Sequence, residues 1–138
     1  MNIDGVTTGI VLDHIQAGKS MEIYRLLELD QLDCSVAIIQ NADSTKYGKK
    51  DIIKIDELIE LDFDMLGYID PNITVNTVKD GKLDKKDHLE LPKTLTNVLT
   101  CKNPRCITTV ERGVAQKFYL ADREKRAYRC AYCDAEHS

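Results

Sequence analysis

The amino-acid sequence predicts an α+β chain, in which a ferredoxin-like βαββαβ sandwich is followed by a small antiparallel-β zinc-binding domain. The first part is indicated by β-branched runs that alternate with helical stretches in the order β-α-β-β-α-β, and by a turn signal that adds a terminal hairpin. The second part is indicated by four cysteines that stand in two pairs within residues 99–138.

The first half of the sandwich is predicted from three segments. Residues 6–15 are enriched in β-branched side chains and contain a continuous apolar run, which predicts a strand. Ser20 is the expected N-cap of a helix over residues 21–29, whose apolar side chains recur on one face. A short apolar run at 34–39 predicts the second strand, and residues 41–50 are expected to form a polar loop.

The second half of the sandwich is predicted from four further segments. Residues 51–55 predict a short third strand, and a helix is expected within 56–69, because the Asp-Pro-Asn sequence that follows cannot continue it. Residues 73–78 alternate as a strand does, and Asp-Gly at 80–81 is a hairpin turn signal. Residues 82–91 then predict a charged edge strand.

Pro92 is expected to close the first domain. The predicted domains are therefore residues 1–93 and residues 94–138, with 94–99 as a connector. The small sheet of the second domain is expected to use four apolar or aromatic residues: Phe118, Tyr119, Leu120 and Tyr128.

The two cysteine pairs are predicted to bind one structural zinc ion. Cys101 and Cys106 form a C-x4-C pair, and Cys130 and Cys133 form a C-x2-C pair 23 residues later. Four thiolates fill a tetrahedral coordination sphere, so that no position remains for a catalytic water. A module of about 40 residues has too small a core to fold without such a ligand.

Two other interpretations of the cysteines are less consistent with the sequence. Disulfides would leave Cys34 unpaired, and the sequence has no signal-peptide pattern. A redox C-x2-C motif would give no role to the first pair, Cys101 and Cys106. Cys34 lies in an apolar run, where a buried small side chain is expected.

The charge distribution limits the function classes. The formal net charge is −4, which argues against a dedicated nucleic-acid binder. Residues 1–98 carry 11 basic and 18 acidic groups, whereas residues 99–138 carry 8 basic and 5 acidic groups. No apolar run approaches membrane length, so we expect no membrane association and a cytoplasmic protein with reduced thiols.

A few polar residues interrupt the predicted strands and are candidate ligand contacts. Asp13 and His14 end the first strand, and Lys54 interrupts the third. Because these strands are neighbours in a ferredoxin-like sheet, the three side chains are expected to converge. The cluster of Lys82, Lys85 and Lys86 in the last strand is either an anti-aggregation device of an edge strand or a phosphate-binding group.

No catalytic constellation is visible in the sequence. Gly18-Lys19-Ser20 resembles the end of a P-loop, but Asp13 occupies the position that requires glycine. The three histidines are scattered, and no serine or carboxylate pair accompanies them. A ligand-binding protein without activity of its own is therefore favoured.

Five stretches together resemble one family, the regulatory chain of aspartate carbamoyltransferase. They run in the order of the family and cover nearly the whole chain. The stretches are GIVLDHIQAGK (9–19), YGKKDIIKID (47–56), ITVNTVKDGK (73–82), ELPKTLTNVLTCKNPRCIT (90–108) and YRCAYC (128–133).

The resemblance implies a non-catalytic regulatory subunit in pyrimidine biosynthesis. Its first domain would bind the effectors CTP, ATP and UTP, and its zinc domain would dock on the catalytic chain. Three regulatory homodimers would assemble with two catalytic trimers. The metal ligands implied by the resemblance are the four cysteines named above.

The resemblance also implies the effector contacts. Asp13 would hold the ribose and His14 the triphosphate, while Lys54 would contact base and ribose and Lys86 the phosphates and ribose. Main-chain groups near Val6 and Gly81 would meet the exocyclic amine of the base. Asn76 and Lys50 match further residues near the effector.

Two alternatives remain at this point. A zinc-ribbon nucleic-acid binder is suggested by six basic residues of the tail: Arg112, Lys117, Arg123, Lys125, Arg126 and Arg129. A stand-alone metabolite-sensing enzyme or binding domain is also compatible with the fold, because ferredoxin-like sheets host many functions.

Overall fold

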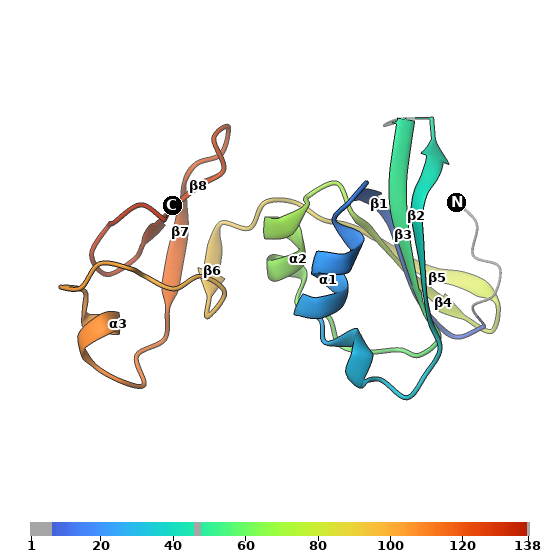
Figure 1. Ribbon diagram of the computed structural model, residues 1–138, viewed down its shortest axis with the longest axis horizontal. Helices are drawn as coiled ribbons and strands as arrows, with labels where there is room; N and C mark the ends of the chain where they lie inside the picture. The colour runs from blue at the N-terminus through green and yellow to red at the C-terminus, as the bar shows by residue number, and fades with distance from the viewer. Residues whose placement is uncertain (1–6, 46–47, 138) are drawn as a thin grey trace. The chain divides into compact units, whose positions relative to one another are not determined.

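A computed structural model describes residues 7–45 and 48–137, and the chain divides into two compact units between Glu90 and Leu91 (Figure 1). The first unit contains β1 (Gly9–Gln16), α1 (Ser20–Leu26), a 3₁₀ turn η1 (Leu29–Gln31), β2 (Val36–Ser44), β3 (Gly48–Ile55), α2 (Phe63–Ile69), β4 (Thr74–Lys79) and β5 (Lys82–His88). The second contains β6 (Thr94–Thr96), α3 (Ile107–Val110), β7 (Lys117–Asp122) and β8 (Ala127–Cys130). No helix in these described ranges is long and apolar enough to cross a lipid bilayer.

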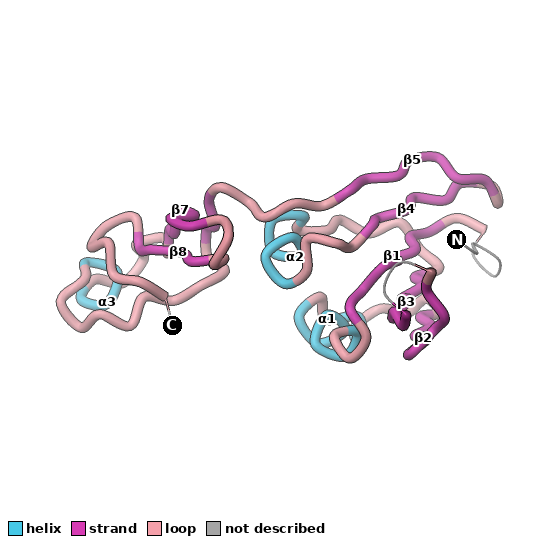
Figure 2. The backbone as a smooth tube through the Cα atoms, turned by 90° about the horizontal axis from the view of Figure 1, so that it is seen from above, coloured by secondary structure: helices cyan, strands magenta, loops and turns pink. Residues whose placement is uncertain are grey.

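The first unit is a five-stranded antiparallel sheet covered on one side by two helices. The strand order is β2-β3-β1-β4-β5, so β1 lies in the centre between β3 and β4. Helices α1 and α2 lie on the same side of this sheet (Figures 1 and 2). The predicted ferredoxin-like sandwich with a terminal hairpin is confirmed.

The two faces of the sheet differ in composition, because successive side chains of a strand point to opposite sides. On the helix side, Leu12 and Ile53 pack into a buried cluster with Ile23 of α1 and Leu66 of α2. The opposite face carries a smaller buried apolar group, Val11, Ile52 and Val78, together with polar residues such as Asp13 and Asn76. We call it the open face, because none of the helices described in this unit lies over it (Figure 2).

The prediction of a loop over residues 41–50 is wrong. Strand β2 continues to Ser44 and β3 begins at Gly48, so that the two strands form a long hairpin. Its outer part is polar, and the Lys49 ammonium group lies 2.7 Å from Oδ1 of Asp43. A hairpin that buries no apolar face leaves no alternating pattern in the sequence, which is why it was missed.

Helix α1 is also capped differently from the prediction. Lys19 is its N-cap residue and makes no side-chain capping bond, so Ser20 does not cap it. The carboxylate of Asp51 in β3 accepts hydrogen bonds from the amides of Gly18 and Ser20 at 3.0 and 3.3 Å. The helix ends at Leu26, before a left-handed residue at Glu28. The cap therefore comes from a residue 31 positions later, which sequence reading does not reach.

The second unit is a three-stranded sheet in the order β6-β7-β8. The four predicted sheet residues lie in β7 and β8, and Phe118 and Tyr128 are both 2% exposed. The Tyr128 hydroxyl donates to the carbonyl of Pro92 at 2.7 Å. The short helix α3 was not predicted. The core of this unit is small, which leaves a large share of its stability to the cysteine cluster.

Candidate metal centre and open sheet face

The four predicted cysteines meet at one point in the second unit. Sγ of Cys101 lies 3.6 Å from Sγ of Cys133, and Sγ of Cys106 lies 3.6 Å from Sγ of Cys130. All four sulfurs lie within 4.8 Å of one another. A tetrahedral zinc ion with Zn–S bonds of about 2.3 Å places its sulfur ligands about 3.8 Å apart. The cluster therefore fits one structural zinc ion, as predicted.

Local turns aim the sulfurs inward. The amide of Cys106 donates to the carbonyl of Asn103 at 3.1 Å, which closes the turn between the first two cysteines. The amide of Asp134 donates to the carbonyl of Cys130 at 2.8 Å and closes the second turn. The amide of Cys101 donates to Oε1 of Gln116 at 3.1 Å. Hydrogen bonds that do not involve the metal therefore position Cys101, Cys106 and the turn that contains Cys133.

The thiols of the cluster differ in acidity. Burial raises the pKa of Cys101 to about 12, so its proton has to be displaced by the metal at neutral pH. The amide of Ala135 and the side chain of Asn103 lower the pKa of Cys133 to about 6. Metal binding by these residues is consequently coupled to proton release.

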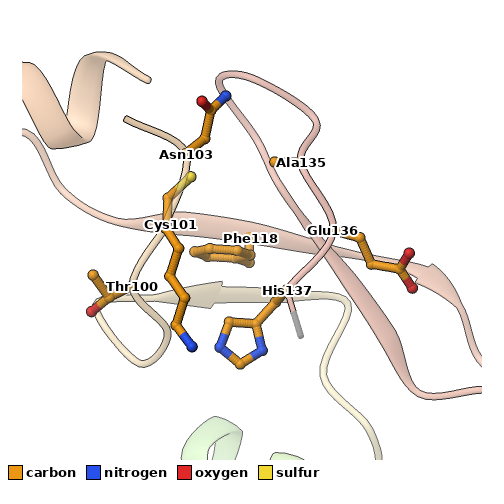
Figure 3. A pocket seen from close by; sticks show the side chains of 8 residues that line it. Thr100, Cys101, Asn103, Phe118, Ala135, Glu136 and His137 are labelled. Carbon is orange, nitrogen blue, oxygen red and sulfur yellow. The ribbon is translucent and has the colours of Figure 1, made fainter. Parts of the chain in front are cut away.

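A cavity of about 120 Å³ adjoins the cluster (Figure 3). Figure 3 shows His137 beside the ring of Phe118. The two rings are arranged edge to face, with their centroids 5.8 Å apart. Among the described residues of this unit, the potential metal-binding atoms that lie close together are the four cysteine sulfurs. His137 is therefore a packing partner of Phe118 and does not belong to the ligand set.

Three of the predicted ligand contacts, Lys54, Asn76 and Lys86, lie on the helix-free face of the sheet. Lys54 pairs with Val11, Val11 pairs with Asn76, and Asn76 pairs with Lys86. Residues that pair directly across strands project to the same side, so these side chains form one row across β3, β1, β4 and β5. We call this line, Lys54–Val11–Asn76–Lys86, the central row. Three of its four members were predicted ligand contacts.

Asp13 lies one step farther along β1, on the same face, opposite Thr74 of β4. Its side chain is fully buried, and its Oδ1 accepts from the Lys50 ammonium at 2.9 Å and from the amide of His14 at 2.7 Å. His14 follows in a bulge with a φ of 60°, a left-handed conformation that costs free energy for a side chain of this kind. Nδ1 of His14 lies 3.1 Å from the Thr74 hydroxyl. The structure therefore brings both Lys50 and His14 into contact with Asp13.

Two buried acceptor atoms on this face have no hydrogen-bond partner among the described residues. They are Oδ2 of Asp13 and Oδ1 of Asn76, whose amide nitrogen donates to the carbonyl of Val11 at 3.3 Å. A buried oxygen without a donor costs about 1–3 kcal/mol. Both atoms are thus buried acceptors that lack a donor among the described residues.

Of the two remaining predicted contacts, Gly81 lies at the turn of the β4–β5 hairpin. Gly81 has a φ of +76°, and its amide already donates to the carbonyl of Thr7 at 2.7 Å, so this N–H is not open to a ligand. Val6 lies outside the described residues. Leu83 was not predicted, yet it pairs with Val78 on the open face and is 47% exposed. An apolar residue inside the charged stretch 82–88 was the signal that could have revealed it.

The geometry defines a metal-binding protein in which a ferredoxin-like sandwich with an open polar face is joined to a small β unit closed by four cysteines. The family model described as "Aspartate carbamoyltransferase regulatory chain, allosteric domain" matches residues 1–90. The model described as the metal binding domain of the same chain matches residues 93–138.

Curated relatives agree with these matches. A Clostridium botulinum aspartate carbamoyltransferase regulatory chain is 49% identical over 138 residues, which are 100% of this chain and 94% of the relative. The Clostridium tetani chain of the same name is 49% identical over 97% of this chain and 94% of its own length. A Bifidobacterium longum relative is 42% identical over 99% and 98%, respectively.

The chain therefore belongs to the family of aspartate carbamoyltransferase regulatory chains, which confirms the resemblance found in the sequence. It is a regulatory chain with an allosteric and a metal-binding domain, and it is not the catalytic subunit. Its four-cysteine cluster holds one structural zinc ion in the second of these domains.

Proposed function

We propose that the open sheet face of the first unit binds nucleoside triphosphate effectors, CTP, ATP and UTP, and that the zinc unit transmits their effect to the catalytic chain. The observation that carries this proposal is the central row, which sets Lys54 and Lys86 on either side of a buried amide. The first unit is acidic as a whole, yet it gathers several cations on this one face. Such a concentration is suited to an anionic ligand.

The phosphates are expected near Lys86 and His14. Lysine ammonium groups hold phosphates as point charges, and Lys86 is exposed on the edge strand β5. The negative charge of Asp13 does not oppose this, because Lys50 compensates it at 2.9 Å. The cationic part of the face therefore receives the triphosphate.

The sugar and base are expected along the same two strands. The partnerless oxygen of Asp13 is an acceptor for a ribose hydroxyl, and that of Asn76 is an acceptor for an amino group. Farther along, the exposed side chain of Leu83, which pairs with the buried Val78, offers an apolar surface on which one side of a base ring can lie. An exocyclic amine at the hairpin end would donate to a carbonyl oxygen of residues 80–81, because an amine N–H requires an acceptor.

A ligand on this face changes the catalytic chain only if it binds two quaternary states with different affinity. An effector that spans β3, β1, β4 and β5 stiffens the sheet whose helix side is packed against α2. A coupling free energy of about 1–3 kcal/mol is ordinary for such systems. The zinc unit, with loops held by metal bonds, is a rigid docking element for the catalytic chain.

The proposed assembly is a homodimer of regulatory chains bound to catalytic chains in the cytoplasm. Reduced cysteine thiolates are needed for the zinc site, and a reducing compartment maintains them. Titration calorimetry of the full-length zinc-loaded chain with CTP and ATP tests the first step. Mixing it with a catalytic trimer, followed by carbamoyl-transfer assays with and without nucleotide, tests the second. Absence of association with zinc bound would reject the docking role.

A further inference from the structure

We infer that Thr108 is a further determinant of the zinc site, whose hydroxyl donates a hydrogen bond to the sulfur of Cys106 and thereby slows the loss of zinc from the second unit. The inference goes beyond the four ligands themselves, because it assigns a role to a residue that does not bind the metal. It concerns the metal-binding domain alone and does not depend on the proposed effector site.

The contact between the two side chains has a defined direction once zinc is bound. Oγ1 of Thr108 lies 3.2 Å from Sγ of Cys106, and in a neutral thiol either atom could donate. A cysteine that binds zinc is a thiolate, which has no proton to give, so the Thr108 hydroxyl is then the donor. Hydrogen bonds to a charged acceptor are stronger than those between neutral groups. Thr108 therefore stabilises the form of Cys106 that binds the metal.

The backbone after Cys106 holds Thr108 in this position. The amides of Thr109 and Val110 donate to the carbonyl of Cys106 at 2.9 and 3.1 Å, which folds the chain back at the start of α3. Thr108 is half-buried, and Cys106 is only 2% exposed. Because so little of Cys106 is open to solvent, water is a poor replacement for the hydroxyl. Removing the hydroxyl thus leaves a buried, charged sulfur with one donor fewer.

The neighbouring threonine makes a different contact. Oγ1 of Thr109 donates to the carbonyl of Asn103 at 2.7 Å, which is a bond between neutral groups within the turn of the first cysteine pair. The amide of Cys106 donates to the same carbonyl at 3.1 Å, so this turn keeps a backbone bond without the threonine. One threonine thus acts on a ligand atom and the other on the loop. Thr109 is therefore a matched control for Thr108.

The hydrogen-bond partners of metal ligands influence how tightly the metal is held. Replacing such a partner typically weakens metal binding by about 10–100-fold. Loss of the Thr108 hydroxyl also leaves the electrons of the Cys106 sulfur less stabilised. In a cobalt-substituted chain this lowers the energy of the sulfur-to-cobalt charge-transfer absorption. The position of that band therefore reports on the sulfur itself, whereas the rate of metal loss reports on the whole site.

The test is zinc loss from the full-length zinc-loaded chain to excess EDTA, together with the absorption spectrum of the cobalt-substituted chain. The proteins compared are the parent, Thr108→Val, Thr108→Ser and Thr109→Val. We expect Thr108→Val to lose zinc about tenfold faster than the parent, and Thr108→Ser, which keeps a hydroxyl, to stay within about twofold. The charge-transfer band should move to longer wavelength in Thr108→Val and stay at the parent position in Thr109→Val.

A Thr108→Val chain with the zinc-loss rate and the cobalt band of the parent overturns the inference. Faster zinc loss in both valine variants, with no band shift in either, also overturns it, because a purely structural role has that signature. If Thr108→Val takes up no metal, Thr108→Ser decides: stoichiometric zinc supports the hydroxyl contact, and its absence contradicts it. Far-UV circular dichroism of the metal-loaded chains verifies that the variants are folded.

Discussion

The ammonium group of Lys50 lies 2.9 Å from Oδ1 of Asp13, and the two side chains are only 13% and 0% exposed. The contact joins β3 to β1 beside the bulge that carries His14. A buried carboxylate is tolerated only when a cation and hydrogen-bond donors compensate it. The pair therefore holds the phosphate end of the proposed effector site in shape while leaving one Asp13 oxygen for the ligand.

Replacing Lys50 with methionine should destabilise the first unit by about 3–5 kcal/mol, because the Asp13 carboxylate would remain buried without its cation. The double variant Lys50→Met with Asp13→Asn should recover much of that loss, since both charges are then removed. Hydrogen exchange of the β1 and β3 amides measures the effect within this unit. A double variant that is no more stable than the single one would contradict the explanation.

Lys86→Ala should weaken CTP binding roughly tenfold or more, because it removes a charged contact from the central row. Zinc content should stay unchanged, since the four sulfurs lie in the other unit. Lys85→Ala is the control, as its side chain faces away from the row. Calorimetry that finds equal affinity in Lys86→Ala and the parent would remove Lys86 from the site.

Cys101→Ala should release zinc and unfold the second unit, because three sulfurs do not complete the tetrahedral shell and the core of this unit is small. The first unit should keep its fold, and docking on the catalytic chain should be lost. Metal analysis together with far-UV circular dichroism measures both effects. Cys34→Ala is the control, since Cys34 packs against the core of the first unit. Stoichiometric zinc in Cys101→Ala would show that the four-sulfur assignment is wrong.

Lowering the pH should reduce the free energy of unfolding of the first unit, because Asp51 becomes protonated. Burial acts to raise the pKa of this carboxyl, but the nearby Ser20 hydroxyl and the amides of Asn41, Gly18 and Ser20 prevail and lower it. The folded pKa is thus below the unfolded value of about 3.9, so the carboxylate stabilises the fold above about pH 4. This stability is lost as the pH falls through the folded pKa.

Asp51→Asn should therefore cost about 2–4 kcal/mol at neutral pH, because one amide oxygen cannot serve three N–H donors. The difference from the parent should shrink below about pH 4, where the parent loses the same interaction. Denaturant unfolding of the two proteins at several pH values gives the comparison. A stability difference that is independent of pH would speak against a role of the charge.

Which residues reach the open face depended on strand register. Lys85 and Lys86 are adjacent in a basic cluster, and nothing in that cluster distinguishes them. The pairing of Lys86 with Asn76 and of Lys85 with Thr77 separates them, since neighbouring strand residues point to opposite sides. The irregularity between Thr77 and Val78 then brings Leu83 to the open face. A one-residue slip would exchange the two sets of side chains.

The amino-acid sequence by itself determined the order of strands and helices in the first unit and the four metal ligands of the second. Both can be predicted because they depend on residues that are close together in the sequence. The elements follow from the period of apolar side chains, and the metal ligands follow from the short gaps within each cysteine pair. Tertiary structure alone decided that Lys54, Asn76 and Lys86 share a row, that Asp51 caps α1, and that Lys50 compensates Asp13. These contacts join residues tens of positions apart, and only the register of antiparallel pairing, set by packing of the whole sheet, brings them together.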